Sequence, residues 1–161
     1  MNATTGNPTT ITARPGTPFL EVVREFDAPR ALVFRAVTEA DYIVQWLGPR
    51  SISMRIETWD ARTGGSYGYV HYREGEDFEA RFRGVFHSIV PDELVIRTFE
   101  FDGAPNEVAL ETMRLEDLGG RTRLTTRSVF PSVEARDMAV ASGMNEGIRE
   151  SMDRLAELVA R

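Results

Sequence analysis

Alternation between apolar and polar residues over positions 51–130 constrains the fold of this chain more than any other feature. The clearest stretch is FEARFRGVFHSIV, residues 78–90. In an extended chain, one side of it would carry Phe78, Ala80, Phe82, Gly84 and Phe86. The other side would carry Glu79, Arg81, Arg83 and His87. This pattern predicts an antiparallel sheet with one face covered and the other face in water.

Similar stretches surround this one and are joined by short turns. Further strands are predicted at residues 19–27, 51–59, 66–72, 91–101, 108–118 and 122–130. The last two flank Gly119-Gly120, a typical hairpin turn. Consecutive strands with short turns form a meander, and a meander needs a cover for its apolar face.

Segments with helical periodicity are expected to cover that face. Two short helices are expected at residues 30–37 and 39–47, and the second ends at Gly48-Pro49. One long C-terminal helix is expected to follow, with Ser132 as its N-cap. Its apolar stripe consists of Met144, Ile148, Met152, Leu155 and Val159. The fold class is therefore α+β, a sheet that grips a helix.

Two glycines inside the expected long helix need a reason, because each costs about 1 kcal/mol relative to alanine. Gly143 and Gly147 are four residues apart and share one helix face. They could allow a close backbone approach, or they could mark a kink, and the sequence leaves both open.

Length and composition limit the number of domains, the classes of partner and the cellular location. The 161 residues suit one domain, predicted over 18–161, after a Thr/Asn/Pro/Gly-rich flexible leader over 1–17. A net charge of −6 argues against a nucleic-acid partner, and the absence of cysteine excludes disulfides and thiolate chemistry. There is no signal peptide and no apolar run long enough for a membrane span, so the prediction is a cytoplasmic protein. No metal and no cofactor are expected.

The residues expected to face the helix are unusual for a dense aliphatic core. On the strands they are Tyr67, Tyr69, His71, Phe82, Phe86, Thr126 and Ser128. The helix adds Met144, Ile148 and Met152, and Trp46 ends the second short helix. Aromatic rings with a few hydroxyl groups and an imidazole are typical of a small-molecule cavity. The same residues also suit ordinary core packing, so Trp46 either fills a core or forms the wall of a cavity.

Several stretches resemble the START/SRPBCC helix-grip superfamily, in the branch named for the activator of heat-shock protein 90 ATPase. They are REFDAPRALVFRAVTEADYIVQWLGP, WDARTGGSYGYV, FRGVFHSIVPDELVIRTFEF, LEDLGGRTRLT and SGMNEGIRESMDRLAEL. The resemblance covers the chain from about Phe19 to the C-terminus. It implies a curved antiparallel sheet of about seven strands wrapped round the long helix, with a deep cavity between them.

The resemblance also implies positions for individual residues. The two short helices would close one end of the cavity, with Trp46 near its mouth. Many relatives carry tryptophan where this chain has Leu47 and Ile148. These smaller side chains predict a cavity that is wider or that suits a different guest.

Residues that could carry chemistry are few. His71 and His87 have opposite strand parity, which argues against a shared metal site. His71 is the best polar candidate, since an imidazole among tyrosines could orient a ligand hydroxyl or move a proton. Glu100 and Glu111 could face the cavity, or they could lie on the exposed side of the sheet. No catalytic residue is assigned.

Three functions remain open from the sequence. The first is a binding protein for a small hydrophobic molecule such as a lipid, polyketide or aromatic metabolite. The second is a cyclase- or hydratase-type enzyme that uses the same cavity, and the third is a cofactor of a chaperone ATPase. An exposed strand edge could support a homodimer.

Overall fold

The computed structural model of the protein describes residues 7–161. The strands are β1 (Thr10–Thr12), β2 (Phe19–Phe26), β3 (Ser53–Trp59), β4 (Ser66–Tyr72), β5 (Glu79–Val90), β6 (Leu94–Phe101), β7 (Ala109–Asp117) and β8 (Thr122–Val129). The helices are α1 (Arg30–Thr38), α2 (Ala40–Trp46), α3 (Val133–Ala141) and α4 (Met144–Val159). No helix within residues 7–161 has both the length and the apolar character needed to cross a bilayer.

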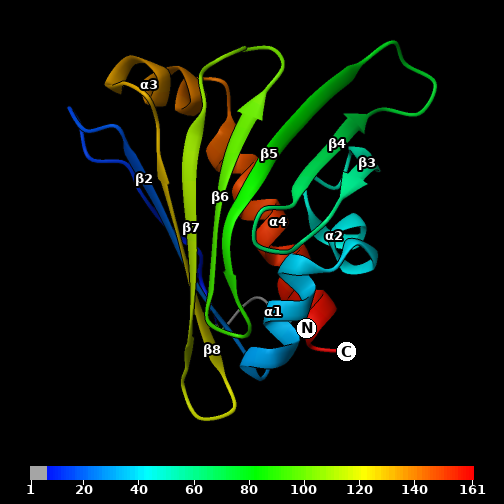
Figure 1. Cartoon of the computed structure of the whole chain (residues 1–161), viewed down its shortest axis with the longest axis vertical. Coiled ribbons are helices and arrows are strands. Elements are labelled where there is room, and N and C mark those ends of the chain that lie inside the picture. The colour runs from blue at the N-terminus through cyan, green and yellow to red at the C-terminus, as the bar shows by residue number, and fades with distance from the viewer. Residues whose placement is uncertain (1–6) are drawn as a thin grey trace.

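All eight strands form one antiparallel sheet in the order β1-β2-β8-β7-β6-β5-β4-β3. Figure 1 shows α4 passing behind β5 and β6, with α1 and α2 beside its C-terminal half and α3 at the opposite end. This arrangement confirms the predicted α+β helix-grip fold. The concave face of the sheet is the face toward α4.

Two elements differ from the sequence prediction. Thr10–Thr12 of the predicted leader form β1, which pairs with β2 and adds a strand to the expected sheet. The prediction of a single long C-terminal helix is wrong, because the helical conformation is interrupted between α3 and α4. Gly143 there has a φ of +93°, a left-handed conformation that glycine adopts without a steric penalty. Of the two roles left open for this glycine, the kink is therefore the correct one.

The Ser132 cap is confirmed, since its hydroxyl accepts a hydrogen bond from the backbone N–H of Ala135 at 3.0 Å. The second glycine, Gly147, lies within α4 and faces the loop after α2. An added Cβ there would lie 3.7 Å from the Pro49 ring, an ordinary contact distance, so the space at this position does not require glycine.

A cluster of fully buried side chains lies where α1 and α2 meet the C-terminal half of α4. Its buried side chains include Phe26, Val33, Val37, Leu155 and Val159. Complete burial of such side chains contributes about 1.5–3 kcal/mol each. This end of the molecule is therefore a conventional hydrophobic core that closes one end of the space between the sheet and α4.

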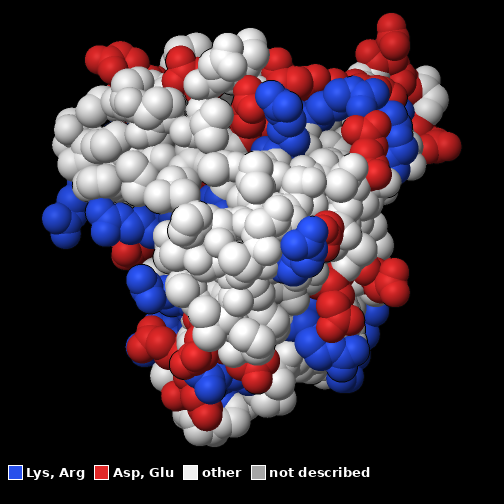
Figure 2. Space-filling view, in the orientation of Figure 1, with Lys and Arg blue, Asp and Glu red and all other residues white. Residues whose placement is uncertain are grey.

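The convex face of the sheet carries a broad uncharged area, with charged side chains gathered mostly around its periphery (Figure 2). One cross-strand row on this face contains Phe19, Val129, Leu110, Thr98 and Val85. The prediction of a homodimer through a strand edge stays a prediction.

Candidate functional site

A buried ion pair lies at the centre of the concave face. Strand register places Arg97 of β6 opposite Glu111 of β7, and Glu111 opposite Ser128 of β8. The Arg97 Nε donates a hydrogen bond to Glu111 Oε1 at 2.9 Å. The two side chains are only 7% and 15% exposed. The space between sheet and helix therefore contains a charged centre as well as apolar walls.

Tyr67 supports this ion pair from β4. The guanidinium of Arg97 lies 4.7 Å from the centre of the Tyr67 ring, a cation–π distance. The Tyr67 hydroxyl donates to the carbonyl oxygen of Thr98 at 2.6 Å. The ring reaches across β5 because position 84 is glycine, where an added Cβ would lie 2.5 Å from the ring. Burial raises the pKa of Tyr67, so its phenol stays neutral.

The Arg97 guanidinium has an unused donor. Its Nη1 is buried and has no hydrogen-bond partner among residues 7–161. Leaving a buried donor unpaired costs about 1–3 kcal/mol, and more when the group is charged. Such an atom on a concave face is a candidate contact for a ligand.

The C-terminal end of β6 lies at the end of the sheet where α4 begins (Figure 1), and an aromatic wall extends from the ion pair along β5 and β6 toward that end. We use this name for Tyr69, Phe82, Phe99 and Phe101. The Phe82 ring stacks on the other three at centroid distances of 5.1–5.4 Å. Phe82 and Phe99 are only partly buried, and Phe101 is 37% exposed. The wall is therefore more open than the core at the other end.

The first turns of α4 are also incompletely buried. Met144 and Ile148 are half-buried, whereas Met152, one turn further along, is buried. The Oδ1 atom of Asn145 is buried and lacks a hydrogen-bond partner within residues 7–161. The open end of the space therefore has apolar side chains and one unpaired acceptor on its helical side.

His71 lies next to the aromatic wall on β4. Its ring is 5.1 Å from the rings of both Tyr69 and Phe82. Burial, assisted by the positive charge of Arg154, lowers the pKa of His71 to about 4. Its Nε2 is buried and has no partner in the described part of the chain. The imidazole is therefore neutral at physiological pH and has an unused ring nitrogen.

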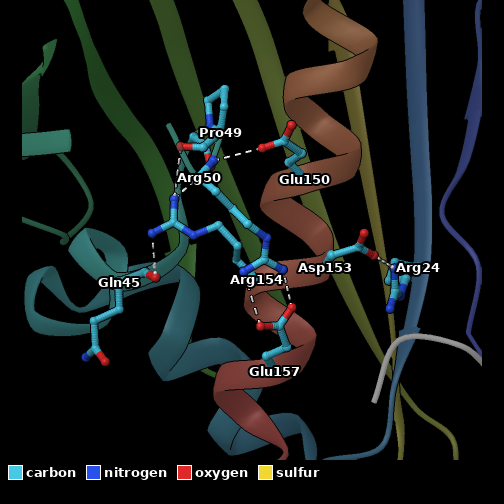
Figure 3. Close-up of polar contacts among 9 residues, drawn as sticks. Arg24, Gln45, Pro49, Arg50, Glu150, Asp153, Arg154 and Glu157 are labelled. Atoms are coloured by element: carbon cyan, nitrogen blue, oxygen red, sulfur yellow. Dashed lines mark hydrogen bonds and ion pairs between the residues drawn. The ribbon is translucent and has the colours of Figure 1, made fainter. Parts of the chain in front are cut away.

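Arg154 fixes the loop after α2 onto α4 (Figure 3). Its Nη1 donates to the carbonyl oxygen of Gly48 at 2.8 Å, and its Nη2 donates to that of Gln45 at 2.9 Å. The Gly48 N–H in turn donates to the hydroxyl of Ser151 at 2.8 Å. The last carbonyl groups of a helix have no partner inside the helix, so this arginine satisfies that of Gln45 in α2 from outside.

Trp46 belongs to the closed end of the space. Its ring is 5% exposed, and its Nε1 donates to the carbonyl oxygen of Ala36 at 2.7 Å. The second tryptophan, Trp59, makes the same kind of contact with Thr38 at 2.7 Å. Both indole groups satisfy carbonyl groups near the end of α1, and Trp46 packs in the hydrophobic core.

Two open hollows of the described residues lie elsewhere. One of about 320 Å³ is lined by Val90, Glu93, Leu94, Arg114, Leu115 and Glu116. The other, of about 350 Å³, lies between residues 13–16 and α3. Neither lies between the concave face and α4.

Comparison with known proteins identifies the family. Residues 27–160 match the family described as Activator of Hsp90 ATPase homolog 1-like protein. The chain belongs to this family. Membership places it in the START/SRPBCC superfamily, whose fold supports ligand binding in general. No curated protein matches the chain.

Solved structures share the fold of this family member. A protein from Rhodobacter sphaeroides is 26% identical, with a TM-score of 0.83 over 94% of this chain and 97% of that one. A protein from Arthrobacter aurescens is 24% identical, with a TM-score of 0.85 over 94% and 91%. Protein Ms6760 from Mycobacterium smegmatis is 21% identical, with a TM-score of 0.83 over 94% and 97%.

The structure brings most of the predicted site residues of this family member onto one surface. Strand residues on the concave face are Tyr67, Tyr69, His71, Phe82, Phe86, Thr126 and Ser128. Those on α4 are Met144, Ile148 and Met152, and Trp46 lies apart from them at the closed end. Their contact with a ligand stays a prediction.

Arg97 and Phe99 were not among the residues predicted from the sequence. Both share the strand parity of the buried Val95, which is the signal that could have revealed them. Glu111 was one of two carboxylates considered, and it faces α4. The other, Glu100, has the opposite parity and bonds to Arg83 and to the N–H of Asn106.

The lowered pKa of His71 predicts a loss of stability in acid. The unfolded chain binds a proton near pH 6.5, but the folded chain does so only near pH 4. The burial of neutral His71 therefore has no protonation-linked cost in stability above pH 6.5, and its effect on the free energy of unfolding becomes more unfavourable as the pH drops toward 4. Allowing for solvent screening, we expect a loss of about 1 kcal/mol between pH 7 and pH 5. Urea unfolding of wild type and of His71→Gln at both pH values measures it.

The control for this measurement is His87→Gln, on the exposed side of β5. His87→Gln should keep the wild-type pH dependence, and His71→Gln should flatten it. Equal pH dependence in all three proteins would contradict the assignment to His71.

Proposed function

We propose that this protein binds a small, mostly apolar molecule between the aromatic wall and the first turns of α4. The single observation that carries the proposal is the incomplete burial of both sides of this space. Stacked Phe82 and Phe99 form one side, and Met144 and Ile148 form the other. Flat aromatic faces and flexible methionine side chains suit an apolar guest of irregular shape.

The closed end gives this space a fixed base. Arg154 holds the loop after α2, and the core around Leu155 is fully buried. Reordering of side chains to admit a guest is therefore expected at the open end. The kink at Gly143, just before α4, leaves the first turn of α4 without the support of a continuous helix.

Native mass spectrometry tests the proposal. Protein purified without denaturation should carry a guest of a few hundred daltons or take one up from a panel of apolar compounds. Phe82→Ala removes the central ring of the wall and should weaken uptake about tenfold, which corresponds to about 1.4 kcal/mol.

The matched control is Val85→Ala, on the convex side of the same strand, where the side chain is 50% exposed. This variant should bind as wild type does. A bare native mass together with no uptake from the panel would reject the proposal. So would equal losses of binding in both variants.

A proton-transferring enzyme of the cyclase or hydratase type is the second candidate. The observation in its favour is the neutral His71 imidazole with an unpaired Nε2 beside the same wall. If the protein turns over a bound polyketide, His71→Gln should abolish turnover while the guest still binds. Product analysis by mass spectrometry separates this function from simple binding. The chaperone-cofactor hypothesis rests on the family description alone.

A further inference from the structure

We propose that the ligand is uncharged and that a carbonyl-type oxygen on it accepts a hydrogen bond from Nη1 of Arg97. This inference rests on the proposed binding function and specifies the chemical class of the guest. It is carried by the contacts and the charge balance of the ion pair on the concave face.

The free donor and the aromatic wall are within reach of one small molecule. Arg97 and Phe99 are two residues apart on β6 and point to the same face. Such residues are separated by about 6–7 Å along a strand. A two-ring aromatic compound lying on the wall would therefore present a substituent at the ion pair.

The remaining contacts of Arg97 leave Nη1 for such a partner. Its Nε is bonded to Glu111, and its guanidinium lies over the Tyr67 ring. Nη1 is buried without a partner among residues 7–161. Because Nη1 is a donor on a charged group, it matches an acceptor such as a ketone, ester or quinone oxygen.

Charge balance favours an uncharged guest over an anion. Glu111 already neutralises Arg97, so a carboxylate there would add an uncompensated negative charge to a buried site. The other concave arginine, Arg24, is paired with Asp153. The nearby Tyr67 is neutral, and so is His71 above about pH 4. The Arg97–Glu111 pair therefore offers a hydrogen-bond donor without a net positive charge.

Three probes with the same two-ring body test the inference. They are 2-ethylnaphthalene, 2-acetonaphthone and 2-naphthoate, and equilibrium dialysis measures their dissociation constants. We expect 2-acetonaphthone to bind about tenfold more tightly than 2-ethylnaphthalene, because it alone adds a charge-assisted hydrogen bond without a charge. We expect 2-naphthoate to bind more weakly than the ketone.

A double variant identifies the donor. Arg97→Met with Glu111→Leu removes the pair without leaving an unpaired charge. It should bind the ketone and the hydrocarbon equally and retain the hydrocarbon affinity. The control is Arg81→Met with Glu57→Leu, which removes an exposed ion pair from the convex face and should keep the preference for the ketone.

The outcomes separate the two proposals. If no probe binds, both the binding function of this space and the inference are rejected. If the probes bind but 2-naphthoate equals or exceeds the ketone, the inference fails and the binding function stands. Persistence of the ketone preference in the Arg97/Glu111 double variant has the same meaning.

Discussion

Replacing Glu111 with alanine should lower the free energy of unfolding by about 3–5 kcal/mol. The substitution leaves the Arg97 guanidinium buried, charged and without the carboxylate that accepts its Nε hydrogen bond. Arginine does not escape this cost by losing its proton, because its pKa is too high. Urea denaturation followed by circular dichroism measures the change.

Two controls separate burial of the charge from simple loss of an ion pair. Glu57→Ala breaks the ion pair with Arg81, in which the Arg81 and Glu57 side chains are 47% and 44% exposed. This substitution should lower the free energy of unfolding by no more than about 1 kcal/mol. Arg97→Met with Glu111→Leu should recover most of the stability lost in Glu111→Ala. If Glu111→Ala costs no more than Glu57→Ala, the ion pair is not buried as described.

Gly84→Ala should be the second severe substitution, with a loss of about 3 kcal/mol or more in unfolding free energy. An added Cβ would lie 2.0 Å from the carbonyl oxygen of Thr98 and 2.5 Å from the Tyr67 ring. Neither neighbour can move cheaply, because the first is backbone and the second donates its hydroxyl to the same carbonyl. We therefore expect the Tyr67 ring to leave its place beneath Arg97. Thermal unfolding and near-ultraviolet circular dichroism report both effects.

Gly68→Ala is the matched control on β4. An added Cβ at this position would meet only the Phe82 carbonyl oxygen, at an ordinary contact distance of 3.7 Å. This variant should unfold at nearly the wild-type temperature. Equal destabilisation by the two substitutions would show that glycine matters here for a reason other than space.

The sheet was predictable from sequence because its strands alternate so regularly. In β5, the parity of Ala80, Phe82 and Phe86 sets the concave face without any knowledge of the neighbouring strands. The same reasoning placed His71 and His87 on opposite sides. The short β1 was missed because three residues, Thr-Ile-Thr, carry too little pattern to distinguish a strand from a leader.

The ion pair was harder to predict because it depends on register. Arg97 and Glu111 are fourteen residues apart, and only the pairing of β6 with β7 brings them opposite each other. A charged residue within a strand usually lies on the exposed face. Their parity with Val95 and Met113 was the available signal, and it becomes convincing only when both strands are read together.

The position of β2 in the sheet has a consequence for synthesis of the chain. β2 is made early, but its long partner is β8, with Phe19 opposite Val129 roughly one hundred residues later. At ribosomal rates of roughly 5–20 residues per second, β2 waits on the order of ten seconds for that partner. The buried Arg24 of β2 also waits for Asp153 of the last helix. The nascent chain therefore exposes one unpaired edge of β2, the edge away from β1, until β8 has been made, and general chaperones would be needed during that interval.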